Sequence, residues 1–97
     1  MPDYPEHPPR PKVPLGQVVI TRNALRQIGL AEAHRGLGRH VVGDWGELNE
    51  HDRNANELAM KNKSRLLSVY WTDNDVKFYI ITEADRSLTT VLLPEDY

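Results

Sequence analysis

The stretch Asp75–Tyr97, DVKFYIITEADRSLTTVLLPEDY, decides the fold class predicted for this chain. It contains two runs rich in β-branched and aromatic residues, Val76–Glu83 and Leu88–Leu93. The polar segment Ala84–Ser87 joins them and has an ordinary length for a hairpin connection. The proline that follows the second run ends the strand, because proline cannot donate to a sheet ladder. The stretch therefore predicts an antiparallel β-hairpin.

A further strand is expected directly before this hairpin. Ser64–Thr72 has a β-rich composition, and Asp73–Asp75 follows it with Asp and Asn residues that tolerate a left-handed turn. Within Val76–Thr82, apolar side chains fall on both faces, which indicates a central strand with helices over one side. We therefore predict a three-stranded antiparallel β-meander. The side chains expected in the core are Leu66, Phe78, Ile80 and Leu92, with Trp45 as the anchor of a glycine-rich corner.

The residues before the meander predict helices. Thr21 can cap one helix, which Gly29 ends, and Leu30–Leu37 is predicted as a second short helix. Asn49 can cap a longer helix that runs to about Lys61. The side chains expected to face inward are Ala24, Leu25 and Ile28 near the start, and Ala55, Leu58 and Ala59 in the last helix. The predicted fold class is therefore α+β, with N-terminal helices packed on the C-terminal meander.

The start of the chain differs in composition from the rest. Met1–Pro14 holds all but one of the seven prolines, and proline fixes φ and removes a backbone donor. We expect a disordered Pro-rich arm over residues 1–14 and a single α+β domain over residues 15–97. Pro8–Pro11 alternatively resembles a segment that docks into a groove on a partner. After the arm, Gln17–Ile20 is a short β-type run, whereas Arg39–Glu47 has too many glycines for a regular element.

Composition narrows the class of protein. A chain of 97 residues buries one modest core, and the absence of cysteine excludes disulfides, thiolate metal sites and a cysteine nucleophile. No apolar run approaches the roughly 18 residues that span a bilayer, so we expect no membrane segment and a cytoplasmic location. A net charge of −2 gives no evidence for sequence-specific DNA binding.

Polar residues suggest one binding surface. Arg86 is predicted at the hairpin tip, where its guanidinium offers a bidentate fork for phosphate or carboxylate. Alternatively, Asp85 and Arg86 fix the turn, with the arginine reaching back to Glu83 or Asp44. The residues expected around this surface are His40, Asp44, Arg65, Glu83, Asp85 and Arg86.

Other residues leave open what the site does. Tyr70, Trp71 and Tyr79 can stack on bases, although aromatic residues in a sheet also serve as core. No catalytic residue is assigned, and no cofactor or metal is expected. The histidines His34, His40 and His51 lack the spacing of a metal site.

Much of the chain resembles a family of small bacterial proteins labelled plasmid-related, which plasmids and integrative elements carry. The resemblance covers the chain from about Leu15 onward and implies an accessory protein of a mobile genetic element without an assigned biochemical activity. It is carried by Arg39-His40, Gly43-Asp44-Trp45-Gly46, Ser64-Arg65-Leu66-Leu67-Ser68, Ile81-Thr82-Glu83-Ala84-Asp85-Arg86-Ser87 and Thr89-Thr90-Val91-Leu92-Leu93-Pro94.

The C-terminal strands are also similar to the closing strands of barnase-type microbial ribonucleases. That resemblance implies a general base, a general acid and cations on the scissile phosphate. The candidates here are Glu83 or Glu47 as base, His40 as acid, and Arg65 and Arg86 as phosphate ligands. The chain departs from the ribonuclease pattern in having Asp85-Arg86 at the turn where those enzymes have a histidine.

Two functions follow as hypotheses. The first is a non-catalytic protein that binds a protein or nucleic acid, RNA included, encoded by the host or by the mobile element. The alternative is a metal-independent endoribonuclease of the barnase type, acting as a toxin.

Overall fold

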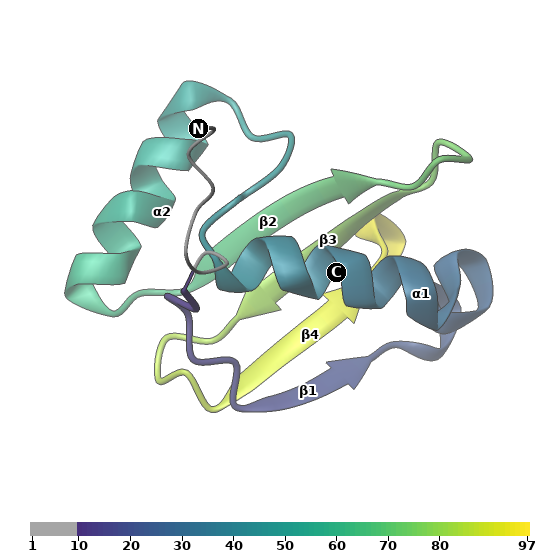
Figure 1. Cartoon of the computed structure of the whole chain (residues 1–97), viewed down its shortest axis with the longest axis horizontal. Coiled ribbons are helices and arrows are strands. Elements are labelled where there is room, and N and C mark those ends of the chain that lie inside the picture. The colour runs from purple at the N-terminus through teal and green to yellow at the C-terminus, as the bar shows by residue number, and fades with distance from the viewer. Residues whose placement is uncertain (1–9) are drawn as a thin grey trace, which may run out of the picture.

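The computed structural model describes residues 10–97 and has an α+β fold in which helices lie over one four-stranded sheet (Figure 1). The elements in chain order are β1 (Gln17–Ile20), α1 (Arg22–Val41), α2 (Glu50–Asn62), β2 (Leu66–Trp71), β3 (Lys77–Thr82), β4 (Leu88–Leu92) and the short 3₁₀ helix η1 (Pro94–Asp96).

The sheet contains the predicted meander and one further strand. Its order is β1-β4-β3-β2, and β2, β3 and β4 pair antiparallel as the sequence predicts. The prediction of three strands is wrong because β1 pairs in parallel with β4, with Gln17 opposite Leu88. A short run such as Gln17–Ile20 does not reveal a partner that lies at the other end of the chain.

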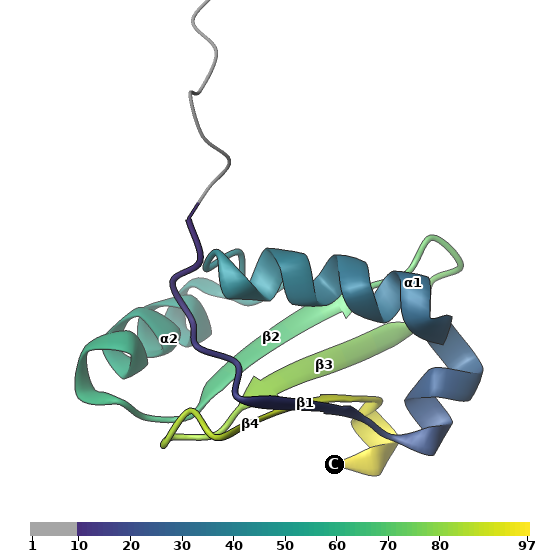
Figure 2. The ribbon, with the colours of Figure 1, turned by 60° about the horizontal axis from the view of Figure 1, so that its bottom comes forward.

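Both helices lie on one side of the sheet, and η1 lies near the other side (Figure 2). Ala24, Ile28 and Ala33 of α1 form the main core with side chains that include Phe78 and Ile80. Gly36 permits this close packing, because a Cβ atom there would lie 2.9 Å from the Phe78 ring. We call the sheet side under the helices the helix face and the opposite side the outer face.

The helix boundaries agree with the predicted caps and with the predicted break at Gly29. The Thr21 hydroxyl accepts from the Ala24 N–H at 3.0 Å, and the Asn49 side chain accepts from the Asp52 N–H at 2.8 Å. Gly29, with φ +77° and ψ 170°, is not helical, and at this kink α1 divides into two helices, as predicted. The second helix continues past the predicted end at Leu37 to Val41, so Arg39 and His40, the start of the segment predicted as irregular, are helical.

The inward faces of the helices also differ in part from the prediction. Ala24, Ile28 and Ala59 are buried, whereas Leu25, Ala55 and Leu58 are exposed. Asn56 lies inward in α2, where its amide donates to the Leu67 carbonyl at 2.6 Å and accepts from the Leu67 N–H at 3.2 Å. A hydrophobic pattern misses this contact, because a polar side chain makes it.

The β2 edge of the sheet is covered by the segment before α2. The Glu47 N–H donates to the Val69 carbonyl at 2.7 Å, and the Val69 N–H donates to the Trp45 carbonyl at 3.1 Å. Gly46, with φ +76°, allows this approach, because a Cβ atom there would lie 2.0 Å from the Val69 oxygen. Trp45 is buried and the Asp44 carboxylate accepts from the Gly46 N–H, which confirms the predicted corner.

The predicted core residues Leu66, Phe78, Ile80 and Leu92 are all buried, which confirms their burial. Leu92 lies on the outer face, however, because it pairs with Tyr79 and not with a residue of the helix face. The prediction that the helices cover it is therefore wrong.

The structure describes only the last part of the predicted Pro-rich arm. Residues 1–9 lie outside the described part of the chain. Lys12 and Val13 both donate to the Val41 carbonyl, at 2.7 and 3.2 Å, and Val13 is only 2% exposed. Val13 joins Trp45 and Ala59 in a second hydrophobic cluster, so a disordered arm up to residue 14 is a wrong boundary.

Val13 should therefore contribute to stability. We expect Val13→Ala to lower the free energy of unfolding by about 2 kcal/mol, because two buried methyl groups are lost and a small cavity remains. Urea denaturation measures this change, and Leu58→Ala, an exposed apolar truncation on α2, is the matched control. Equal midpoints for the two variants would contradict the packing of Val13.

Candidate functional site

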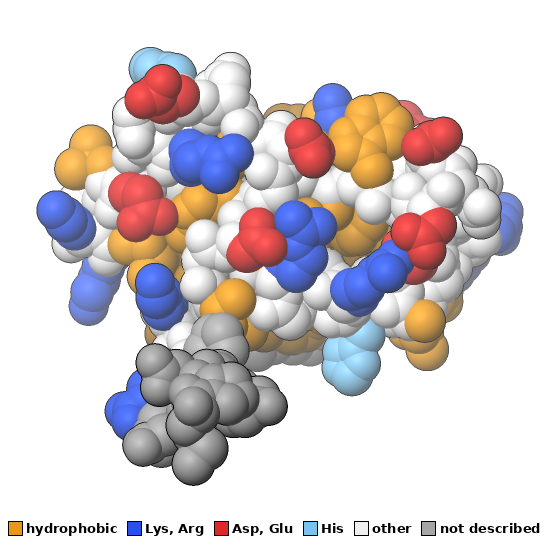
Figure 3. Space-filling model, turned by 45° about the horizontal axis from the view of Figure 1, so that its top comes forward, with side chains coloured by type: hydrophobic (Ala, Val, Ile, Leu, Met, Phe, Trp, Pro, Cys, Tyr) orange, Lys and Arg blue, Asp and Glu red, His pale blue; other side chains and the backbone are white. Residues whose placement is uncertain are grey.

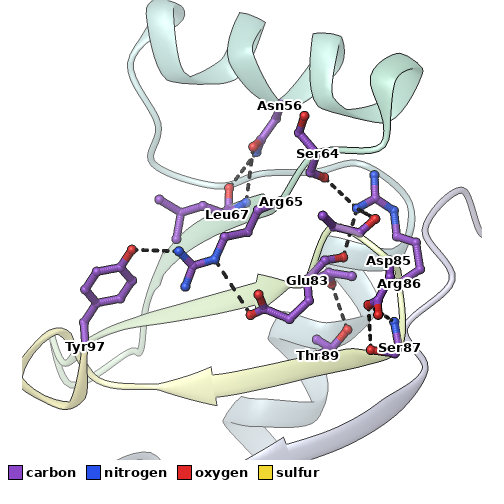
Figure 4. A network of polar contacts seen from close by, with 12 residues as sticks. Asn56, Ser64, Arg65, Leu67, Glu83, Asp85, Arg86, Ser87, Thr89 and Tyr97 are labelled. Carbon is purple, nitrogen blue, oxygen red and sulfur yellow. Dashed lines mark hydrogen bonds and ion pairs between the residues drawn. The ribbon is translucent and has the colours of Figure 1, made fainter.

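The six residues predicted for one surface fall into three places in the structure. His40 is buried beneath α1. Asp44 lies at the corner that covers the β2 edge, and the other four lie around the β3–β4 hairpin and the neighbouring start of β2 (Figure 4).

His40 lies at the centre of a buried hydrogen-bond chain. Its side chain is 0% exposed, with Nδ1 2.6 Å from the Ser68 hydroxyl and Nε2 2.9 Å from the Thr82 hydroxyl. The Thr82 and Thr89 hydroxyl oxygens lie 2.8 Å apart, and the Thr89 hydroxyl donates to the Leu15 carbonyl at 2.7 Å. We call this chain the His40 relay. It joins α1, β2, β3, β4 and the segment before β1.

The direction of the His40 relay follows from its last member. The Leu15 carbonyl can only accept, so it takes the one hydroxyl proton of Thr89. Thr82 must then donate to Thr89, and its oxygen accepts from the His40 Nε2–H. Nδ1 is left without a proton and accepts from Ser68. The geometry thus fits a neutral imidazole with its proton on Nε2.

Electrostatics favour the same neutral state. Burial, and after it the positive charge of Arg86, lowers the pKa of His40 from 6.5 to about 4. The ring also packs edge-on against Trp45, with centroids 5.6 Å apart. A side chain with both nitrogens bonded inside the protein cannot donate a proton to a substrate at the surface.

Arg86 holds the hairpin tip to the end of α2. Its guanidinium donates to the backbone carbonyls of Ser64 at 2.6 Å, Glu83 at 3.1 Å and Ala84 at 3.3 Å, and also to that of Ala59 at 3.1 Å (Figure 4). The Ala59 carbonyl belongs to the last turn of α2, where a cation is favourable. The geometry supports the alternative in which Arg86 fixes the turn, although its targets are backbone carbonyls and not the Asp44 or Glu83 carboxylates.

Asp85 and Asp44 likewise stabilise local backbone. The Asp85 carboxylate accepts from the Ser87 hydroxyl at 2.6 Å and from the Ser87 N–H at 3.0 Å, and these bonds lower its pKa. The Asp44 carboxylate accepts from Arg39 at 2.8 and 3.2 Å, which is the main reason that its pKa is lowered. The Asp44 carbonyl accepts from the Tyr70 hydroxyl at 2.6 Å.

Arg65 and Glu83 lie together on the outer face, 3.8 Å apart (Figure 4). Arg65 also donates to the Tyr97 hydroxyl at 3.0 Å, with its guanidinium 5.3 Å from the ring centroid. Tyr97 packs edge-on against Tyr79, with centroids 6.4 Å apart. These side chains border a cleft of about 470 Å³, lined by Arg65, Leu67, Tyr79, Ile81, Pro94 and Tyr97.

A second cation extends this group along the outer face. The Lys77 ammonium lies 5.8 Å from the Tyr79 ring centroid and 5.9 Å from that of Trp71. Trp71 and Tyr97 are 49% and 71% exposed. We call Arg65, Lys77, Trp71, Tyr79 and Tyr97 the aromatic–cation row. Trp71 and Tyr79 were predicted from the sequence as residues that can stack on bases, whereas Lys77 and Tyr97 were not predicted. Alternation along β3 places Lys77 beside Tyr79, whereas no local pattern links Tyr97 to the sheet.

The ribonuclease candidates do not come together around one cavity. Thr82, which bonds His40, points to the helix face, so its neighbour Glu83 points to the outer face. Within residues 10–97, no three His, Asp or Glu side chains are placed to hold a metal ion. No helix in that part of the chain is long and apolar enough to cross a membrane.

Acidic and basic side chains are interspersed over the side of the molecule that Figure 3 shows. Several are paired, as Arg39 is with Asp44 and Arg35 with Glu32. The aromatic–cation row on the opposite side is therefore the more distinctive candidate site.

The His40 relay predicts acid sensitivity. The pKa of His40 is lowered on folding, so between pH 6.5 and about 4 the unfolded chain binds more protons than the folded one. The free energy of unfolding should therefore fall as the pH falls through this range, by up to roughly 3 kcal/mol from this group. Urea denaturation from pH 7 to 4 measures the loss. His40→Gln, which cannot titrate, should lose less stability over the same range, and parallel curves would contradict this account.

Arg86 should behave as a structural residue. We expect Arg86→Ala to lower the free energy of unfolding by about 1.5–3 kcal/mol, because carbonyls lose a charged donor. Arg86→Gly should be less harmful by about 1 kcal/mol, since residue 86 has φ +62° and glycine adopts this conformation without strain. Chemical denaturation separates the two. An unchanged midpoint for Arg86→Ala would leave the guanidinium available for a ligand and contradict the structural role.

Comparison of the chain with models of protein families, with curated proteins and with solved structures gave no match. The feature that most favours a ligand is the aromatic–cation row, because Trp71 and Tyr97 are exposed and cations lie close to the rings.

Proposed function

We propose that the protein is a non-catalytic binder of single-stranded nucleic acid, with RNA as the expected ligand, and that the outer face of the sheet is its binding surface. The resemblance to plasmid-related proteins makes an accessory role in a mobile element part of this proposal. One observation carries it, which is the aromatic–cation row on the side of the sheet that the helices leave open.

The row has the two components that single-stranded nucleic acid requires. Every base has a π-face that can stack on an aromatic ring, and the backbone phosphates favour nearby cations. Trp71 and Tyr97 present exposed rings, and Tyr97 packs edge-on against Tyr79. The Lys77 ammonium lies over the Trp71 and Tyr79 rings, and the Arg65 guanidinium lies over the Tyr97 ring. The cleft between Tyr79 and Tyr97 provides a recess for one base, with the Arg65 guanidinium at its border.

The charges predict how such binding would depend on salt. Only Arg65 and Lys77 contribute cations to the row, and the whole chain has a net charge of −2. Two phosphate contacts on a single strand correspond to a slope of about −1.4 for log K against log salt. Stacking, which is insensitive to salt, should then supply most of the affinity. This arrangement does not suit a protein that coats duplex DNA.

The positions of the acidic side chain and of the histidine favour binding without cleavage. Glu83 is the acidic side chain closest to Arg65 in the row, and it lies on the other side of the sheet from the neutral, buried His40. General acid–base cleavage needs both groups within reach of one phosphate. The endoribonuclease hypothesis therefore gains no support from a shared site.

Fluorescence anisotropy with labelled single-stranded oligonucleotides tests the proposal. Trp71→Ala and Tyr97→Ala should each weaken RNA binding by roughly 5- to 150-fold, equivalent to about 1–3 kcal/mol for a lost stack. Leu58→Ala, which removes an exposed apolar side chain from α2, should leave binding unchanged. Matched RNA, single-stranded DNA and duplex probes distinguish the ligands.

Two results would contradict this function. Absence of binding to every single strand, or equal binding by all three variants, would exclude the aromatic–cation row as a nucleic-acid surface. Shortening of the RNA in the presence of EDTA would instead favour the metal-independent endoribonuclease.

A further inference from the structure

The two edges of the sheet differ in whether another segment of the chain covers them. The β2 edge is covered by the Trp45–Glu47 segment, which bonds to Val69. The β1 edge lies at the other end of the strand order, and within residues 10–97 no strand pairs with its outer side. Edge strands are usually guarded by a charged side chain or a proline. Gln17–Ile20 has neither.

The backbone groups that face outward can be identified from the ladder. Gln17 donates to the Ser87 carbonyl and Thr21 to the Val91 carbonyl, both at 3.0 Å. Successive residues of a strand direct their N–H and C=O groups to opposite sides, so the odd-numbered residues of β1 face β4. Val18 and Ile20 therefore direct theirs away from the sheet. They present two donors and two acceptors.

An apolar groove runs beside these groups, between β1 and α1. One recess of about 360 Å³ is lined by side chains that include Val18, Ile20, Leu30, His34 and Leu37. Leu30 is 67% exposed and Val18 is 43% exposed, which is unusual for large apolar residues next to each other. No acidic side chain lines this recess or the hollow next to it. The groove thus combines an unpaired strand edge with an exposed helix face.

We propose that a second copy of this chain occupies the groove, with the two β1 strands paired antiparallel about a two-fold axis through Val19. In this register Val18 of each copy lies opposite Ile20 of the other. Both residues direct their polar groups outward, so the pattern is self-complementary and yields four hydrogen bonds. The backbone N–H and C=O groups of Val19 face β4, so Val19 forms the central non-hydrogen-bonded pair with Val19 of the other copy.

The side chains of the groove suit a second copy as well as the backbone does. The two-fold axis brings the apolar stripe of one α1, with the exposed Leu30 and the partly buried Leu37, beside the same stripe of the other. The groove has no carboxylate, and Arg35, which lines the adjoining hollow, is paired with Glu32. The sheets join into one of eight strands, which leaves both outer faces on the same side.

Single cysteines test this register directly, because the natural chain has no cysteine. A central non-hydrogen-bonded pair has Cα atoms about 4.5 Å apart, which a disulfide can bridge. Val19→Cys should therefore form a covalent dimer under mild oxidation. Gln17→Cys is the matched control on the same face of the same strand. Its two copies would lie roughly 13 Å apart, too far for a disulfide.

Sedimentation of the unmodified protein completes the test. Over a roughly hundredfold range of protein concentration, we expect the unmodified protein to associate reversibly into a dimer. Val18→Lys should raise the dissociation constant of this dimer by about tenfold or more. If Val18→Lys does not fold, the cysteine pair decides. A wild-type monomer throughout, or equal crosslinking by Val19→Cys and Gln17→Cys, would overturn the proposal. Capture of an extended peptide from another protein by a monomeric chain would also overturn it. None of these readouts depends on nucleic-acid binding.

Discussion

The His40 relay is the interaction on which the rest of the structure depends. It connects one helix, three strands and the segment before β1 through hydroxyl groups and a single imidazole. A buried polar group without a partner is unfavourable by several kcal/mol, so each member requires the others to be in place. Apolar packing brings α1 onto the sheet, but apolar contacts tolerate sliding. The relay fixes the position of α1, because only one placement satisfies both ring nitrogens.

The two faces of the sheet contain different kinds of side chain. The helix face contains the buried polar groups and most of the core, whereas the outer face has the accessible rings and cations. The side chains of adjacent residues, such as Thr82 and Glu83, therefore point to opposite faces of the sheet. Arg86 belongs to the structural side in spite of its position at a hairpin tip, since its guanidinium is occupied by carbonyls of α2 and the turn. The candidate site therefore differs from the structural residues in the accessibility of its side chains and not in their type.

Local sequence patterns predicted the parts of the fold that depend on neighbours. Alternation gave the three meander strands, and Thr21 and Asn49 gave the helix starts, because a cap bonds within its own first turn. The same reasoning recognised Gln17–Ile20 as a β-type run but missed its pairing with β4, and it missed the contacts of Val13 and Asn56, because these partners lie in distant segments. It placed His40 on a surface, since a histidine in a glycine-rich stretch shows no sign that Ser68 and Thr82 enclose it. Three residues of the aromatic–cation row, Arg65, Trp71 and Tyr79, were named from the sequence, whereas Lys77 was not. Tyr97 was missed because only the folded chain brings it to β3.

The parallel pairing of β1 with β4 has a consequence for the order of events during synthesis. Leu15 and Thr89, which close the relay, are separated by 74 residues. A growing chain can form α1, α2 and the first meander strands while β1 waits without a partner and His40 lacks its completed network. Closure of such a long loop is entropically unfavourable and slow compared with local contacts. Completion of the sheet is therefore expected to follow formation of the local elements, with the side of β1 that pairs with β4 left unpaired until β4 has been synthesised.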